Sequence, residues 1–174
     1  MLCNWLMVYI GNFLGSFCIA VMMYHTGLFD SSEGLLGGTV IRIAAGKTAL
    51  PFYSALLLGL MCNWLVCLAI WVSNGARDTA GKVLVIFPII GLFVISGFEH
   101  SIANMYYIMA GLFAQQNPQW LLKSGLSVDL LAGLNWGTFL TKNLIPVTIG
   151  NAIGGTVMVG FAYWFSLRER STRS

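Results

Sequence analysis

The chain has few charged side chains, and this scarcity excludes most soluble folds. Only 9% of its 174 residues are Asp, Glu, Lys or Arg, against about 25% in typical soluble domains. Hydrophobic residues make up 57% of the chain, and the mean hydropathy is +0.80. In water this composition would leave large apolar patches exposed, whereas lipid solvates them. We therefore predict an integral membrane protein, with the lipid bilayer as its surroundings.

The residues that support nucleic-acid binding, metal binding or catalysis are also missing. The formal net charge is only +3, and no basic run alternates with aromatic residues. The two histidines, His25 and His100, are far apart, and the His-Glu-x-x-His pattern is absent. The four cysteines lie inside apolar runs without metal-site spacing: Cys3, Cys18, Cys62 and Cys67. We expect no nucleic-acid partner, no metal, no cofactor and no enzymatic activity.

Four apolar segments are long enough to cross a hydrocarbon core, which needs ~20 residues of helix. We expect membrane helices near residues 2–25, 50–73, 83–113 and 143–167, the third with a break near 97–101. Polar connections are expected at 26–47 and 115–141, and the second could carry a short helix. The fold class predicted is all-α, a polytopic helical bundle that forms one transmembrane domain over residues 1–174.

One stretch of sequence occurs twice. Residues 4–15 (NWLMVYIGNFLG) and residues 143–154 (NLIPVTIGNAIG) share six identities at a constant offset of 139. Two apolar segments lie between the copies, so the copies would cross a bilayer in opposite directions, as inverted repeats of transporters and channels do. If the repeat unit has three segments, two further helices belong upstream of Met1, and the chain is an N-terminally truncated part of a six-helix protein.

Both copies of the repeat contain the same small and polar residues. Gly11 and Gly15 in the first copy, and Gly150 and Gly154 in the second, follow the Gly-x-x-x-Gly pattern of close helix packing. Asn12 and Asn151 are symmetry mates under the repeat, and we expect at least one of them to face a substrate path. These features indicate a packing seam and a polar path that share the same segments.

Two ionisable neighbours, Glu99 and His100, lie inside the third apolar segment. Each costs on the order of 2.5–3.5 kcal/mol at membrane depth, so they should face a polar interior. Ser96 and Gly97 directly before them predict a broken helix, because Gly is permissive and Ser can bond freed backbone groups. In a regular second half-helix, Asn104 shares a face with His100. The alternative is that Glu99 and His100 pair only with each other as a structural couple.

Three motifs resemble the signatures of the formate/nitrite transporter family. They are residues 63–71 (NWLVCLAIW), 97–105 (GFEHSIANM) and 143–151 (NLIPVTIGN), in the expected order across essentially the whole chain. The resemblance implies an aquaporin-like protomer of six helices with an inverted repeat, assembled as a homopentamer with one pore in each protomer. This chain would match helices three to six. The second family helix, whose broken loop carries a threonine facing the histidine, has no counterpart here.

The resemblance also implies roles for single residues. His100 matches the central histidine of the pore, and Asn151 and Asn63 match pore-facing amides. Lys47 matches a vestibule lysine that attracts anions, and Glu99 and Asn104 match polar partners that connect this lysine with the histidine. The hydrophobic constrictions on the outer and inner sides are matched by Phe93 and Val66.

These residues together favour a channel or transporter for small monovalent weak-acid anions. Pro146 resembles the formate-type branches of the family more than the nitrite-type, which implies formate, and His100 allows coupling to protons. The alternatives are a nitrite or hydrosulfide channel of the same family, or an aquaporin-like channel for neutral solutes. The last would need paired Asn-Pro-Ala motifs, whereas the one Asn-Pro of the chain is Asn117-Pro118 in a connection.

The distribution of basic residues predicts the orientation of the chain. Five of them would lie on the side of the C-terminus and four on the other, which is a slim positive-inside bias. The first group is Arg77, Lys82, Arg168, Arg170 and Arg173, and the second is Arg42, Lys47, Lys123 and Lys142. We expect a multi-pass protein of the cell inner (plasma) membrane with a cytoplasmic C-terminus.

Overall fold

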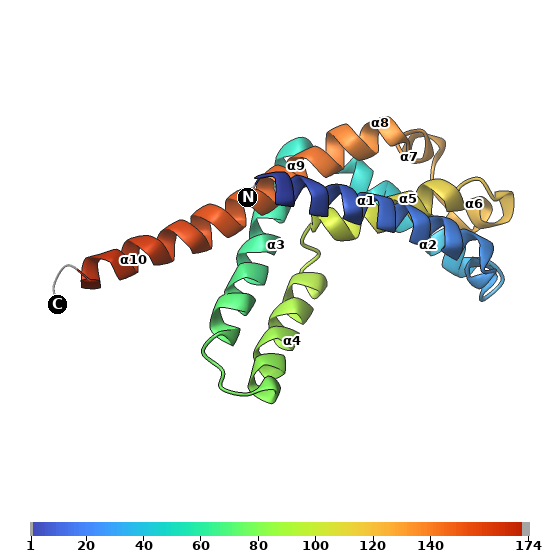
Figure 1. Cartoon of the computed structure of the whole chain (residues 1–174). Coiled ribbons are helices and arrows are strands. Elements are labelled where there is room, and N and C mark those ends of the chain that lie inside the picture. The colour runs from blue at the N-terminus through green and yellow to red at the C-terminus, as the bar shows by residue number, and fades with distance from the viewer. Residues whose placement is uncertain (1, 172–174) are drawn as a thin grey trace. The chain divides into compact units, whose positions relative to one another are not determined.

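The structure, a computed structural model, describes residues 2–171, and the side chains of 169–171 are not described. Arg173 and the side chain of Arg170, which the orientation argument uses, lie outside the described residues. Within 2–171 every regular element is a helix, as predicted (Figure 1). The chain divides into two compact units, each built from two separate stretches of sequence. Whether these units act as the one transmembrane domain that we expected stays a prediction.

The first unit combines residues Met1–Phe52 with Ser101–Ile145. Its longer helices are α1 (Leu2–His25), α2 (Leu35–Ala49) and α5 (Ser101–Ala114), and α5 contacts both α1 and α2. The shorter elements are η1 (Leu28–Asp30), α6 (Pro118–Ser124), α7 (Val128–Ala132), α8 (Trp136–Thr138) and the π-helix η2 (Phe139–Leu144). Its apolar core is centred on α5, where Met105, Ile108 and Met109 are fully buried.

The second unit combines Tyr53–His100 with Pro146–Ser174. Its helices are α3 (Phe52–Ser73), α4 (Thr79–Ile95), α9 (Ile145–Ile153), the π-helix η3 (Gly154–Phe161) and α10 (Ala162–Ser171). Helices α3 and α4 form a hairpin (Figure 1). The Asp78 side chain caps α4 by accepting a hydrogen bond of 2.7 Å from the Gly81 N–H, which fixes where the hairpin turns back.

The polar connection that we expected at 26–47 is wrong for most of its length, because α2 occupies Leu35–Ala49. The glycines that suggested a loop are instead packing sites. A β-carbon at Gly37 would lie 2.5 Å from the Trp120 ring, and one at Gly38 would lie 2.6 Å from the Lys123 backbone. The helix therefore uses glycine for a close approach to α6, at a cost in helix propensity of about 1 kcal/mol per residue.

The apolar helices have the length and composition of membrane spans. Three are long enough to cross a bilayer: Leu2–His25, Phe52–Ser73 and the composite helix Trp136–Arg168. Two shorter apolar helices, α4 and α5, flank residues 96–100, so the predicted broken helix is present. The chain is a polytopic helical membrane protein.

The last composite helix is irregular on both sides of α9. The π-helix η2 ends two residues before Pro146, which has no N–H for the carbonyl of Lys142 and crowds the preceding turn. A helix that meets proline in this way kinks or widens, and π-turns are one form of widening. The composite helix starts at Trp136 rather than near residue 143 as we expected, and Asn143 lies in its widened turn.

Candidate functional site

The break between α4 and α5 keeps its backbone hydrogen-bonded. Gly97 has φ +68°, a left-handed conformation that favours glycine. The N–H groups of Gly97 and Phe98 donate to the carbonyls of Val94 (3.1 Å) and Phe93 (3.2 Å). The Glu99 N–H donates to the Leu58 carbonyl of α3 at 3.4 Å. Since unpaired backbone groups are costly in lipid, these bonds are what let an irregular stretch lie between two apolar helices.

Asn151 holds the same break from a second side. Its Nδ2 donates to the Glu99 carbonyl at 3.0 Å and to the Gly59 carbonyl at 2.8 Å. The Asn63 side chain in turn donates to the Asn151 carbonyl at 2.7 Å. Asn151 therefore joins α3, α9 and the break in one polar cluster, in which Glu99 is only 4% exposed.

The close packing of α3 against α9 depends on glycine. A β-carbon at Gly59 would lie 2.8 Å from the Val147 carbonyl oxygen, and one at Gly150 or Gly154 would collide with backbone carbonyls of α3. Small residues let the two backbones approach, as in other membrane helix pairs. This approach is what brings the Asn151 amide within reach of the Gly59 carbonyl.

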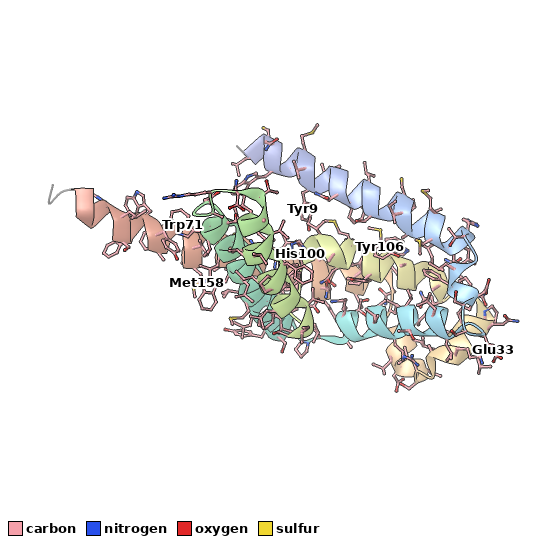
Figure 2. The ribbon with its side chains drawn as sticks, turned by 90° about the horizontal axis from the view of Figure 1, so that it is seen from below. Tyr9, Glu33, Trp71, His100, Tyr106 and Met158 are labelled. Atoms are coloured by element: carbon pink, nitrogen blue, oxygen red, sulfur yellow. The ribbon has the colours of Figure 1, made fainter. Side chains whose placement is uncertain are left out.

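His100 is the last residue of the break and directly precedes α5 (Figure 2). Its half-buried ring lies 6.2 Å from the ring of Phe93, centroid to centroid. Because His100 precedes α5 rather than lying in it, the regular-helix argument that gave it a common face with Asn104 does not apply. Val66 is half-buried on α3, almost one helical turn beyond Asn63.

Lys47 and Asn104 belong to the first unit, where a third residue connects them. The Asn104 Nδ2 donates to the Asn143 Oδ1 at 2.8 Å, and the Asn143 Nδ2 donates to the Lys47 carbonyl at 2.9 Å. The Lys47 ammonium lies 5.7 Å from the centroid of the Tyr107 ring, within cation–π range.

Apart from Val66, the predicted site residues fall into three groups by the contacts that they make. Asn63, Asn151 and the Glu99 backbone are hydrogen-bonded, and His100 lies beside Phe93. Lys47 and Asn104 are bridged by Asn143. Sequence reasoning did not assign a site role to Asn143, although it is the first residue of the second repeat copy.

Comparison with known proteins shows the family of this chain. The family described as Formate/nitrite transporter matches residues 1–165. Formate channel FocA of Escherichia coli (strain K12) is 39% identical over 169 residues, which cover 95% of this chain and 59% of FocA. Formate channel BtFdhC of Bacillus thuringiensis is 37% identical over 161 residues, 92% of this chain and 54% of that protein. The chain therefore spans somewhat more than half the length of these relatives.

The solved structures that resemble this chain are also channels of this kind. A pentameric formate channel with formate bound has a TM-score of 0.86 and 39% identity, covering 95% of this chain and 66% of that one. An FNT family ion channel has a TM-score of 0.67 and 30% identity, covering 91% of this chain and 56% of that one. The matches are to channels and transporters, not to enzymes. The family match covers most of the sequence, and the chain belongs to the formate/nitrite transporter family.

Proposed function

We propose that the protein to which this chain belongs is a channel for small monovalent weak-acid anions, with formate as its main substrate. The observation that carries the proposal is the identity of 37–39% to proteins named formate channels over more than nine-tenths of this chain. The pentameric state of a formate channel with a TM-score of 0.86 supports a homopentamer as the working assembly.

The proposed mechanism begins with attraction and desolvation. Lys47 provides a positive charge near which anions concentrate, and Phe93 and Val66 form apolar constrictions. A carboxylate loses hydration at such a constriction and crosses it poorly, whereas neutral formic acid crosses easily. Transfer of a proton, or a strong hydrogen bond, from His100 to the anion would lower this barrier. The polar cluster of Asn63, Glu99 and Asn151 supports the role of His100 by fixing the backbone that carries it.

The test of this mechanism is the pH dependence of formate flux in proteoliposomes that contain the complete channel. His100→Asn keeps the size and hydrogen-bonding capacity of the side chain but cannot titrate. Since histidine is the side chain whose charge changes most readily near neutral pH, the substitution should flatten the wild-type profile between about pH 5 and 8. The matched control is His25→Asn, at the exposed end of α1, which should leave the profile unchanged. Overlaid profiles of wild type and His100→Asn, with the pentamer intact, would reject a proton role for His100.

The proposed role of Lys47 has a separate test. In Lys47→Ala, formate flux should fall at low substrate and low ionic strength, and the difference should shrink in high salt. The screening length of charge attraction falls from about 30 Å at 0.01 M salt to about 3 Å at 1 M salt. Lys123→Ala is the control, since Lys123 already forms an ion pair of 3.8 Å with Glu33. A loss that is equal at all salt concentrations would assign Lys47 a structural role.

Substrate choice and orientation complete the proposal. Parallel flux measurements with formate, nitrite, hydrosulfide and water in the same vesicles separate formate from the alternatives, and formate should give the highest rate.

We also propose a plasma-membrane protein with a cytoplasmic C-terminus, on the basis of the slim excess of basic residues on that side. A reporter fused after Ser174 that is active only in the cytoplasm tests this orientation.

A further inference from the structure

Helix α2 ends two residues after Lys47, and a proline follows close behind. In a regular helix the Lys47 carbonyl would accept from the N–H of the residue four positions later. That residue is Pro51, which has no N–H. Lys47 lies in the last turn of α2, and the chain turns into an extended conformation at Leu50, with ψ 136°. Carbonyls in a final turn need partners from elsewhere, and in a lipid environment such partners come from the protein.

Asn143 provides a donor to the Lys47 carbonyl from 96 residues further along the chain. Its Nδ2 donates to the Lys47 carbonyl at 2.9 Å, and its Oδ1 accepts from the Asn104 side chain at 2.8 Å. The Asn143 side chain is fully buried, at 0% exposure. A buried amide with both of its ends hydrogen-bonded has one well-defined orientation, so it can fix the position of what it contacts.

From this geometry we infer that Asn143 is the positioning residue of Lys47, and that it sets where the charge of the proposed vestibule lies. It holds the last turn of α2 against α5, the helix that carries both Asn104 and Tyr107. The Lys47 ammonium stays near the Tyr107 ring because the backbone beneath it is fixed. The role in anion attraction rests on the proposed function, whereas the role in holding Lys47 does not.

Chemical labelling of lysine in the purified chain tests the positioning role without any transport assay. Asn143→Leu keeps the approximate size of the side chain and removes both hydrogen bonds. With an amine-reactive reagent and mass spectrometry, the labelling rate of Lys47 should rise roughly three- to tenfold, which is the change that the loss of about one hydrogen bond gives. Lys82, at the start of α4 in the other unit, is the internal reference and should not change.

The matched control is Thr48→Val at the neighbouring position. Thr48 is also buried, but among the described residues its hydroxyl donates to carbonyls of its own helix, at Ala44 and Ala45. Labelling of Lys47 should be unchanged in this variant. If Asn143→Leu does not fold, Asn143→Ala, which introduces no extra bulk, replaces it. Unchanged Lys47 labelling in a folded Asn143 variant, or an equal rise in Thr48→Val, would overturn the inference.

Formate flux in the complete channel then tests the consequence for transport. Asn143→Leu should lose the same low-salt advantage that Lys47→Ala loses, and the double variant should lose no more than Lys47→Ala alone. Additive losses would overturn the link between the two residues. If wild type carries no formate, the proposed function fails, but the labelling result still decides whether Asn143 positions Lys47.

Discussion

The two copies of the repeat have the same key residues in different surroundings. In the second copy, Gly150 and Gly154 are pressed against the backbone of α3, so that a β-carbon at either would collide with a carbonyl oxygen. In the first copy, no described atom outside the helix lies within 4 Å of a β-carbon added at Gly11 or Gly15. The Gly-x-x-x-Gly pattern therefore provides a surface for close packing, but a neighbouring helix must be present for packing to occur.

The paired asparagines differ in the same way. The Asn12 side chain donates to the Val8 carbonyl of its own helix at 2.9 Å, which is a local bond. The Asn151 side chain donates to carbonyls 52 and 92 residues away in sequence. A side-chain amide in a membrane helix bonds to a neighbouring helix where one is within reach. The same residue type therefore makes a local hydrogen bond in the first copy and forms the centre of a polar cluster in the second.

The largest effect expected from this comparison is for glycine. In the 174-residue chain, Gly150→Leu should destabilise by about 3 kcal/mol or more, because its side chain has no room beside Leu56 and Leu60. Gly11→Leu should be neutral or slightly stabilising, since leucine is the better helix former. Thermal unfolding of both variants in detergent measures the difference. Equal destabilisation would show that the two faces are packed alike and would break the comparison.

An intermediate effect is expected for the asparagines. Asn151→Leu removes two hydrogen bonds to buried carbonyls, at about 1–2 kcal/mol each, so unfolding should become easier by roughly 2–4 kcal/mol. Asn12→Leu removes only a bond within a helix turn and should cost less than about 1 kcal/mol. Denaturant or thermal unfolding of the two variants side by side provides the measurement. A larger loss at Asn12 would contradict the assignment of the polar cluster to the second copy.

The smallest effect is expected for the aliphatic pairs, which include a built-in control. Val147 is 0% exposed and Val8 is 55% exposed, so Val147→Ala should cost about 2 kcal/mol and Val8→Ala close to nothing. Ile10 and Ile149 are exposed to similar extents, 46% and 43%. Alanine at either of these two positions should therefore have the same small effect. A clear difference between Ile10→Ala and Ile149→Ala would show that burial does not explain the contrast between the copies.

The membrane segments could be predicted from the sequence because each is a long apolar run, interrupted in the third segment by the polar residues of the break. The first expected helix, 2–25, is α1 (Leu2–His25), and the break flagged by Ser96 and Gly97 lies at 96–100. Helix α2 could not be predicted in this way. Its glycines weaken helix propensity, and their compensation is a contact with Trp120, far away in the sequence. Local signals cannot report a stabilisation that depends on a distant partner.

The candidate site shows the same limit. Glu99 and His100 stand out in the sequence because ionisable residues are rare in apolar segments. Asn143 does not stand out, because a single amide in an apolar helix is common and its partners lie in other segments. The sequence does show one of the two facts needed: Pro51, four residues after Lys47, has no N–H to donate to the Lys47 carbonyl. Only the structure identifies which side chain replaces that donor.

The break between α4 and α5 has a consequence for biosynthesis. With 17 and 14 residues, the two helices are ~26 Å and ~21 Å long at 1.5 Å per residue, each short of a hydrocarbon core of ~30 Å. Neither half-helix alone spans a core of that thickness. The Asn151 amide that holds the Glu99 carbonyl is synthesised 52 residues after it. During translation, the break with Glu99 and His100 is therefore made well before Asn151, the last residue that stabilises it in lipid.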